Sequence, residues 1–254
     1  MARSSRFTQH FAPQADLFPR LQDGLRYVVV EGVIGAGKTT LARELARRFG
    51  GRLVLERFEE NPFLERFYED GPRWAFQTQL SFLADRFKQQ QELQEADLFH
   101  PVTVSDYAFD KDRIFARLTL TGDELRLYET MFAIMQPATP RPDLVVYLQS
   151  TPARLMQNIS KRGRAMEANM DPAYVARLHE AYTDYFRGFT KAPLLIVNTA
   201  EADFVGNPAH LERIVHAIAW GDLGAARAFN PAEGAASGAG DAPQPAGGVA
   251  GKVE

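Results

Sequence analysis

The sequence contains no cysteine, which excludes a disulfide-bonded scaffold, a zinc site built on cysteines and thiol catalysis. It has no apolar run of 18 residues, so no transmembrane helix is expected, and the opening segment MARSSRFTQHFAPQ lacks the apolar stretch of a secretory signal. There is no basic excess either: 29 Lys and Arg face 32 Asp and Glu, which disfavours a binder of duplex nucleic acid. We therefore expect a cytoplasmic protein without a membrane or nucleic-acid partner.

What is present is the composition of one globular domain with extended ends. The 254 residues are 45% hydrophobic and 24% charged. Ala, Gly, Pro and Ser fill 17 of the last 25 positions, and none of those 25 is aromatic, so this end has little apolar surface to bury. We expect an N-terminal arm over residues 1–23, one domain over 24–225 and a disordered tail over 226–254.

Short apolar strands alternate with helical patterns along the domain. The expected strands are 25–31, 52–56, 102–106, 143–148 and 194–198, and the expected helices are 41–49, 61–68, 74–98, 112–117, 123–134, 152–162 and 172–186. This alternation predicts an α/β fold with a five-stranded parallel sheet and helices on both faces. Ligands bind such sheets beyond the carboxyl ends of the strands, where Glu31, Glu56 and Asp106 are expected.

A glycine-rich segment between the first predicted strand and the first predicted helix fits the pattern G-x-x-x-x-G-K-[ST] in full, in the context that the motif requires. Glycines let backbone N–H groups turn toward phosphate oxygens at a helix N-terminus. The segment predicts a P-loop that binds a nucleoside triphosphate, in which Lys38 reaches the β- and γ-phosphates and Thr39 is a ligand of Mg²⁺. Asp106, at a strand end facing this loop, is the expected second anchor for Mg²⁺. The residues expected to hold the phosphates are Gly32, Val33, Ile34, Gly35, Ala36, Gly37, Lys38, Thr39 and Thr40.

Four further segments limit which molecule could accept the phosphate. They are Glu56 within LERFEENP, Tyr68 to Trp74 followed by Gln79 and Arg86, Ser105-Asp106-Tyr107 followed by Asp112, and Lys161-Arg162-Gly163-Arg164 followed by Glu167. With these segments the chain resembles the deoxynucleoside kinase family from about Tyr27 to Asn198, in order and in spacing. It is most similar to the bacterial enzymes that act on purine deoxynucleosides.

The resemblance implies transfer of the γ-phosphate of ATP to the 5′-hydroxyl of a deoxynucleoside, in nucleotide salvage. Glu56 is then the general base for the hydroxyl, a role that a carboxylate at a strand end beside the loop can fill. Tyr68 and Glu167 match the pair that holds the sugar 3′-hydroxyl. Deoxyadenosine and deoxyguanosine are the favoured acceptors, and deoxycytidine is a further possibility.

Gln79 and Arg86 are seven residues apart on one predicted helix, about 10.5 Å along its axis, so they share a face. An amide and a guanidinium on one face suit the edge of a flat base. The family uses the matching arginine together with an aspartate, which here is Asp112. Alternatively, Gln79 lies on a solvent-exposed face of the helix and has no role in binding.

Lys161, Arg162 and Arg164 surround Gly163 after a predicted helix. One interpretation is a helix C-terminus with a glycine cap and favourable cations. By resemblance, the segment is an Arg-rich lid whose Arg162 and Arg164 stabilise charge on the transferred phosphoryl group, with Arg162 also contacting the nucleotide. Both interpretations can hold at once.

The chain departs from the family pattern at two positions. Tyr107 stands where the family has an arginine that reaches the 5′-oxygen and the phosphates, and Asn158 stands where an arginine stacks on the donor base. Arg113, Lys111 and the Tyr107 hydroxyl are the candidates to replace the first arginine, and the sequence does not choose between them.

Two other functions stay open at this point. A nucleoside-monophosphate kinase of the thymidylate type shares the loop and the lid, but Glu56 would repel a phosphorylated acceptor. A nucleotide-binding partner subunit of a heterodimer, with little activity alone, would explain Tyr107. Family members are usually dimers, so a homodimer is expected, and the apolar stripe Leu125, Leu127, Tyr128, Met131, Phe132 and Met135 is either its interface or core.

Overall fold

The computed structural model describes residues 8–10, 24–94, 99–221 and 227–233. The strands are β1 (Thr8–His10), β2 (Tyr27–Gly32), β3 (Arg52–Val54), β4 (Thr103–Ser105), β5 (Leu144–Gln149), β6 (Leu194–Asn198) and β7 (Arg227–Phe229). The helices are α1 (Lys38–Phe49), α2 (Leu64–Glu69), α3 (Gly71–Gln94), α4 (Lys111–Thr119), α5 (Gly122–Met135), α6 (Pro152–Arg162), α7 (Pro172–Arg187) and α8 (Pro208–Trp220). Three single-turn 3₁₀ helices, η1 (Phe58–Glu60), η2 (Gln136–Ala138) and η3 (Ala165–Glu167), complete the described elements.

The strands form one seven-stranded sheet in the order β1-β3-β4-β2-β5-β6-β7. The prediction of five strands was therefore wrong in number, although the five predicted strands are the parallel centre, β3-β4-β2-β5-β6. β1 adds an antiparallel edge against β3, and β7 adds a parallel edge against β6. Each edge strand has only three residues, too few for an alternating pattern, and lies within a segment that its composition marks as an arm or a tail.

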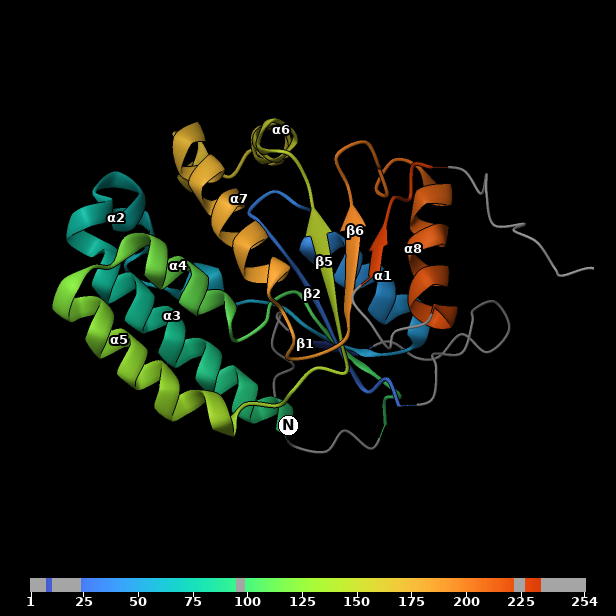
Figure 1. The fold of residues 1–254 in the computed structure, drawn as a ribbon, viewed down its shortest axis with the longest axis horizontal. Coiled ribbons are helices and arrows are strands. Elements are labelled where there is room, and N and C mark those ends of the chain that lie inside the picture. Colours follow the sequence, from blue (N-terminus) through green and yellow to red (C-terminus); the bar gives the residue numbers. More distant parts are fainter. Residues whose placement is uncertain (1–7, 11–23, 95–98, 222–226, 234–254) are drawn as a thin grey trace, which may run out of the picture.

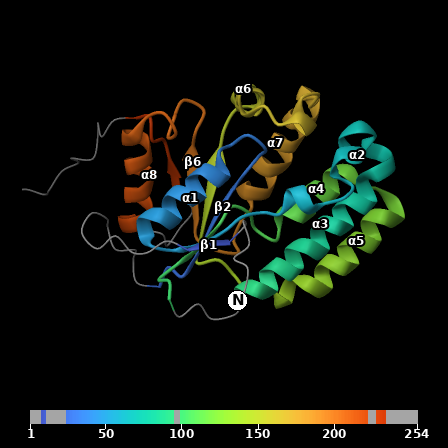
Figure 2. The ribbon, with the colours of Figure 1, turned by 180° about the vertical axis from the view of Figure 1, so that it is seen from behind.

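Helices cover both faces of the sheet. In Figure 1, α2, α3, α4, α5 and α7 lie on one side of the strands and α1 and α8 on the other, and Figure 2 shows the same layers from behind. The central strand β2 is therefore buried on both faces, and Val28, Val29 and Val30 are at most 1% exposed. Val29 pairs with Ser105 on one side and with Val145 on the other, which brings the carboxyl ends of β2, β4 and β5 together.

Local sequence signals define the starts of three later helices. Thr151, Asp171 and Asn207 cap α6, α7 and α8 by accepting a backbone N–H of the first turn, and a proline follows each cap. Helix α8 was not among the predicted helices. Its buried residues Leu211, Ile214, Val215 and Ile218 have helical spacing, so the signal was present in the sequence.

Most of the proposed dimer stripe on α5 is internal. Tyr128 and Phe132 are fully buried and belong to a small core with Phe109, against which Leu125, Met131 and Met135 pack. Leu127 and Ile134 are 50% and 74% exposed. A homodimer remains a prediction. Among the residues that the structure describes, no helix is both long enough and apolar enough to span a membrane.

Candidate active site

The glycine-rich loop connects β2 to α1 at the carboxyl edge of the sheet. Gly35 and Gly37 have φ of 86° and 94°, the left-handed region that glycine adopts without strain. Neighbours also crowd both positions: a Cβ on Gly35 would lie 2.7 Å from the Leu155 carbonyl oxygen, and one on Gly37 would lie 2.7 Å from Phe204 Cζ. Lys38 Nζ crosses the loop and donates to the Gly32 and Val33 carbonyls at 2.7 and 3.1 Å. The loop therefore presents the start of α1 and a lysine ammonium to one space.

Asp106 links this loop to the end of β3. Thr39 Oγ1 donates to Asp106 Oδ2 at 2.5 Å, and the Glu56 backbone N–H donates to Asp106 Oδ1 at 2.8 Å. Burial, together with the negative charge of Glu56, raises the pKa of Asp106. The described residues contain no group of three or more His, Cys, Asp or Glu that would hold a metal ion by themselves. Thr39 and Asp106 are a neighbouring hydroxyl and carboxylate, the kind of oxygen groups that Mg²⁺ takes from a protein when phosphates provide its other ligands.

The Glu56 carboxylate is held by two cations. Arg86 donates to its Oε1 through Nε, at 3.1 Å, and through Nη2, and Lys111 Nζ donates to Oε2 at 2.5 Å. Burial alone would raise the pKa of Glu56, but the charges and hydrogen bonds of Lys111 and Arg86 outweigh it and hold the pKa well below its ordinary value. Glu56 is thus an ionised carboxylate whose charge is balanced by Arg86 and Lys111.

The face of α3 that turns toward Glu56 carries Gln79 and Arg86. Arg86 also pairs with Asp112, which is fully buried, and lies over the Phe82 ring at 4.5 Å. Gln79 is 2% exposed, and its Oε1 has no hydrogen-bond partner among the described residues. A buried amide oxygen without a partner costs about 1–3 kcal/mol, which indicates a place for a donor from a ligand. The structure therefore brings Gln79, Arg86 and Asp112 to one wall.

The opposite wall comes from α2 and from the segment after α6. Glu167 accepts from Arg162 Nη2 at 2.5 and 2.6 Å and lies 3.6 Å from Arg164, which stacks over Phe58 at 4.3 Å. Burial and the charge of Glu167 raise the pKa of Tyr68. Both predicted arginines, Arg162 and Arg164, therefore pair with Glu167, which lies near Tyr68.

These walls enclose a cavity of about 100 Å³ that also reaches Lys38, Thr39 and Asp106. Small-molecule sites usually measure about 300–1,000 Å³, so this cavity is smaller than a usual ligand site. Three of the side chains that line it, Glu56, Arg86 and Lys111, pair with one another.

A larger cavity of about 760 Å³ shares Lys38, Thr39, Arg162 and Arg164 with the smaller one. It is also lined by other residues of the loop, by α6 from Arg154 onward and by residues after β6, at positions 199 and 202–205. Asn158 donates its Nδ2 to the Gly35 carbonyl at 2.9 Å and so supports the loop. Phe204 and Val205 line the same space, and Val205 is 68% exposed. No motif marks these two residues in the sequence, which is why sequence reasoning missed them.

The structure distinguishes the three candidates for the missing arginine. Tyr107 is fully buried, and its hydroxyl donates to Gln89 Oε1 at 2.7 Å. Arg113 donates to Glu129 at 3.1 Å, away from Glu56. Of the three, Lys111 contacts Glu56, at 2.5 Å; the sequence named it as a candidate but did not favour it, because its position depends on how α4 packs.

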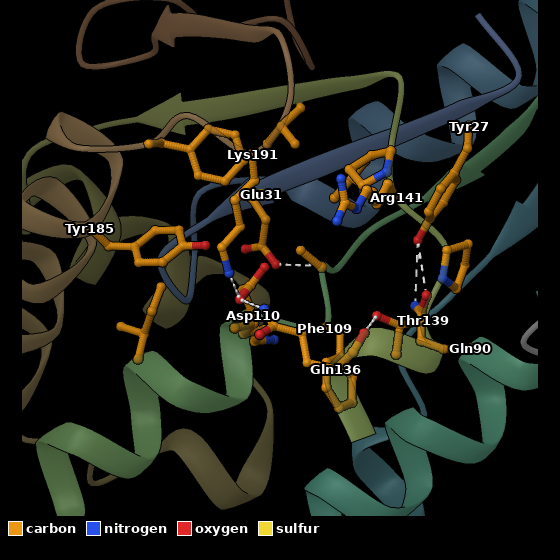
Figure 3. Close-up of a pocket in the computed structure, with 18 of the residues that line it drawn as sticks. Tyr27, Glu31, Gln90, Phe109, Asp110, Gln136, Thr139, Arg141, Tyr185 and Lys191 are labelled. Atoms are coloured by element: carbon orange, nitrogen blue, oxygen red, sulfur yellow. Dashed lines mark hydrogen bonds and ion pairs between the residues drawn. The ribbon is translucent and has the colours of Figure 1, made fainter. Parts of the chain in front are cut away.

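A third cavity, of about 410 Å³, lies between β2, the C-terminal end of α7 and residues 136–142. Figure 3 shows Glu31 on β2 and Tyr185, Asp110 and Lys191 around it. Asp110 bonds Lys191 and accepts from Gln136 at 2.9 Å. The glycine-rich loop and Glu56 are not in its lining, whereas Lys111 borders this cavity as well as the one around Glu56.

Comparison with known proteins shows the family of the chain. A family model described as deoxynucleoside kinase matches residues 28–220. The deoxyadenosine/deoxycytidine kinase of Bacillus subtilis (strain 168) is 34% identical over 200 residues, covering 76% of this chain and 91% of the relative. The deoxyguanosine kinase of the same strain is 34% identical over 194 residues, covering 74% and 93%. The solved structure of the deoxyadenosine kinase from M. mycoides with bound dATP shares the fold, with a TM-score of 0.65, 24% identity and coverage of 75% of this chain and 97% of that one.

Proposed function

We propose that the chain, which belongs to the deoxynucleoside kinase family, phosphorylates a purine deoxynucleoside. Its phosphate donor is ATP. The protein is an ATP-dependent phosphotransferase that acts on a hydroxyl group of a deoxynucleoside. The observation that carries the assignment of the site is the position of Glu56, between the glycine-rich loop and the wall of Gln79 and Arg86, in one cavity.

The loop at residues 32–40 acts as a P-loop in this proposal. Its amides and the N-terminus of α1 hold the phosphates of ATP, and Lys38 adds a positive charge next to them. The cavity lined by Asn158, Phe204 and Val205 receives the rest of the donor nucleotide. Its opening onto the loop, and the exposure of Val205, support that assignment.

Thr39 and Asp106 would hold a magnesium ion next to the phosphates of ATP. Thr39 Oγ1 donates to Asp106 Oδ2 at 2.5 Å, so the two oxygens lie together beside the loop, and a cation there would neutralise a carboxylate that is buried near Glu56. Bound Mg²⁺ would supply positive charge that neutralises the triphosphate oxygens. Asp106 would also keep the end of β3 in place through its bond from the Glu56 backbone.

Glu56 acts as the general base. The 5′-hydroxyl gives its proton to the carboxylate as the 5′-oxygen attacks the γ-phosphorus. Tyr68 and Glu167 hold the sugar 3′-hydroxyl, for which the proximity of the two groups offers a donor and an acceptor. Arg162 and Arg164, which both lie on Glu167 here, form a lid that closes on the transferred group.

The base of the acceptor packs on Phe82 and meets Gln79, Arg86 and Asp112. The unpartnered Oε1 of Gln79 accepts a hydrogen bond from the base, while the Arg86–Asp112 pair offers a donor and an acceptor. Purines, with a wide hydrogen-bonding edge, suit this wall. One of the two relatives is named for deoxyguanosine and the other for both deoxyadenosine and deoxycytidine, so deoxycytidine is the pyrimidine to compare with the purines.

The test is phosphorylation of the four deoxynucleosides by the purified chain with ATP and Mg²⁺, with deoxyadenylate and thymidylate as control acceptors. We expect turnover of deoxyadenosine or deoxyguanosine, and a fall of about 10²–10⁴ in kcat for Glu56→Gln because the general base is lost. Glu60→Gln, on the exposed 3₁₀ turn next to the site, is the matched control and keeps its rate. Turnover confined to the monophosphates would refute the proposal, and so would binding without turnover.

A further inference from the structure

The state of Glu56 poses a problem for its role as a base. Arg86 bonds its Oε1 and Lys111 bonds its Oε2, so both oxygens of the carboxylate are paired with cations. Each oxygen already accepts a hydrogen bond from a cation, so a substrate hydroxyl has to compete with Arg86 or Lys111 for it. One of the two cations must leave before Glu56 can take the proton of a hydroxyl efficiently.

The contacts of the two cations show which one can move. Arg86 is held by two carboxylates, Glu56 and Asp112, and by the Phe82 ring. Lys111 Nζ has Glu56 as its one hydrogen-bond partner within the described part of the chain, and the Phe115 ring is 5.6 Å away. Its four-carbon stem can swing while its backbone stays in place.

The backbone at Lys111 is fixed from the neighbouring residue. Asp110, directly before it, bonds Lys191 beyond the end of α7 and Gln136 of η2, as Figure 3 shows. The start of α4 is therefore tied to two other parts of the chain. A movement of Lys111 away from Glu56 is confined to its side chain.

A second ammonium group lies close to the first. Lys38 and Lys111 both line the cavity around Glu56, so two ammonium groups face the same space and repel each other. An anion that enters between Lys38 and Lys111 relieves this repulsion. In a phosphotransferase that anion is the phosphoryl group on its way from donor to acceptor.

We propose that Lys111 is a catalytic residue that leaves Glu56 for the transferred phosphoryl group, in the place of the arginine that position 107 lacks. This inference rests on the proposed function. In the step, the 5′-oxygen forms a bond to the γ-phosphorus and the hydroxyl proton passes to Glu56. The bond from the phosphorus to the bridging oxygen breaks, and ADP leaves with its electron pair. Lys111, once on the phosphoryl oxygens, both stabilises their charge and frees Glu56 to accept the proton.

The experiment compares two ligands that differ only in the phosphoryl group. Calorimetric titration measures the binding of deoxyguanosine and of deoxyguanosine 5′-monophosphate to the full chain and to its Lys111→Met variant. Deoxyadenosine and deoxyadenosine 5′-monophosphate are compared in the same way. We expect Lys111→Met to weaken binding of the monophosphates by about 10- to 100-fold, the effect of one charge-assisted hydrogen bond, and to change deoxynucleoside binding by less than about threefold. Lys111→Arg, which keeps the charge, restores most of the monophosphate affinity.

The control is Arg113→Met on the same helix, whose cation pairs with Glu129, and it leaves both ligands unaffected. Equal weakening of deoxynucleoside and monophosphate by Lys111→Met would overturn the proposal, because it would mean that Lys111 only positions Glu56. Unchanged monophosphate affinity would overturn it as well. If the unmodified chain binds no deoxynucleoside, the proposed function fails together with this inference.

Discussion

Gln79 and Gln89 form a natural pair for testing where the acceptor base binds. Both are on α3, and both are 2% exposed. They differ in their hydrogen bonds: Gln89 donates to the Leu55 carbonyl at 2.8 Å and accepts from the Tyr107 hydroxyl at 2.7 Å, whereas Gln79 Oε1 has no partner among the described residues. The same substitution at the two positions should therefore have opposite effects.

Replacing each glutamine by methionine keeps the volume and removes the amide. At Gln79 this removes a polar atom that costs stability, so the free energy of unfolding should rise by about 1 kcal/mol, or about 2–4 °C in Tm for a domain of this size. At Gln89 it leaves a buried carbonyl and a buried hydroxyl without that partner, so stability should fall by about 2–5 kcal/mol.

Activity should change in the other direction. Gln79→Met deprives the base of its hydrogen bonds, so kcat/KM for purine deoxynucleosides should fall by about 10- to 300-fold, while KM for ATP stays the same. Thermal unfolding by circular dichroism and a coupled kinase assay measure the two quantities. A Gln79→Met protein that is less stable than the parent by 2 kcal/mol or more, or fully active on deoxyguanosine, would refute the reasoning.

Three other predictions follow from the donor side and from the core. Burial lowers the pKa of Lys38 from 10.5 to about 8 in the folded protein, so kcat/KM for ATP should be level below pH 8 and should fall above it, toward about tenfold per pH unit. Between pH 8 and 10.5 the unfolded chain still holds this proton while the folded chain has lost it, so the free energy of unfolding should rise with pH over that range. A rate that stays level up to pH 10 would contradict this. Gly37→Ala should cost about 1–2 kcal/mol and weaken ATP at least about tenfold, because φ is 94° and the added Cβ meets Phe204; unchanged nucleotide titration would be inconsistent with the loop's role. Tyr107→Phe should lower stability by about 1–2 kcal/mol through its lost bond to Gln89 and leave both KM values unchanged, whereas a changed KM would mean that the hydroxyl reaches the substrate.

The central part of the fold could be predicted from the sequence because its signals are local. Five short apolar runs indicate the parallel strands, and the strand at Leu194–Asn198 matches its predicted range. The edge strands β1 and β7 could not be predicted in this way, since three residues paired to a distant strand carry no periodic pattern. Helix α8 was overlooked although Asn207 and Pro208 give a clear start signal.

In the site, the sequence predicted the groups that belong to motifs, and the structure brings them together: Thr39 with Asp106, and Arg86 with both Glu56 and Asp112. It did not predict that Lys111 would reach Glu56, because that contact depends on the packing of α4. Nor did it predict that Tyr107 would point into the core, since a strand-end residue can face either way.

The position of β2 in the sheet also has a consequence for the synthesis of the protein on the ribosome. The Tyr27 N–H donates to the Asp143 carboxylate across 116 residues of chain, and β2 lies between β4 and β5. At about 5–20 residues per second, the ribosome needs roughly 6–25 seconds after making β2 before β5 is available. Throughout that interval a strand with three consecutive valines has at least one unpaired edge, so the nascent chain is prone to aggregation until translation has passed residue 149.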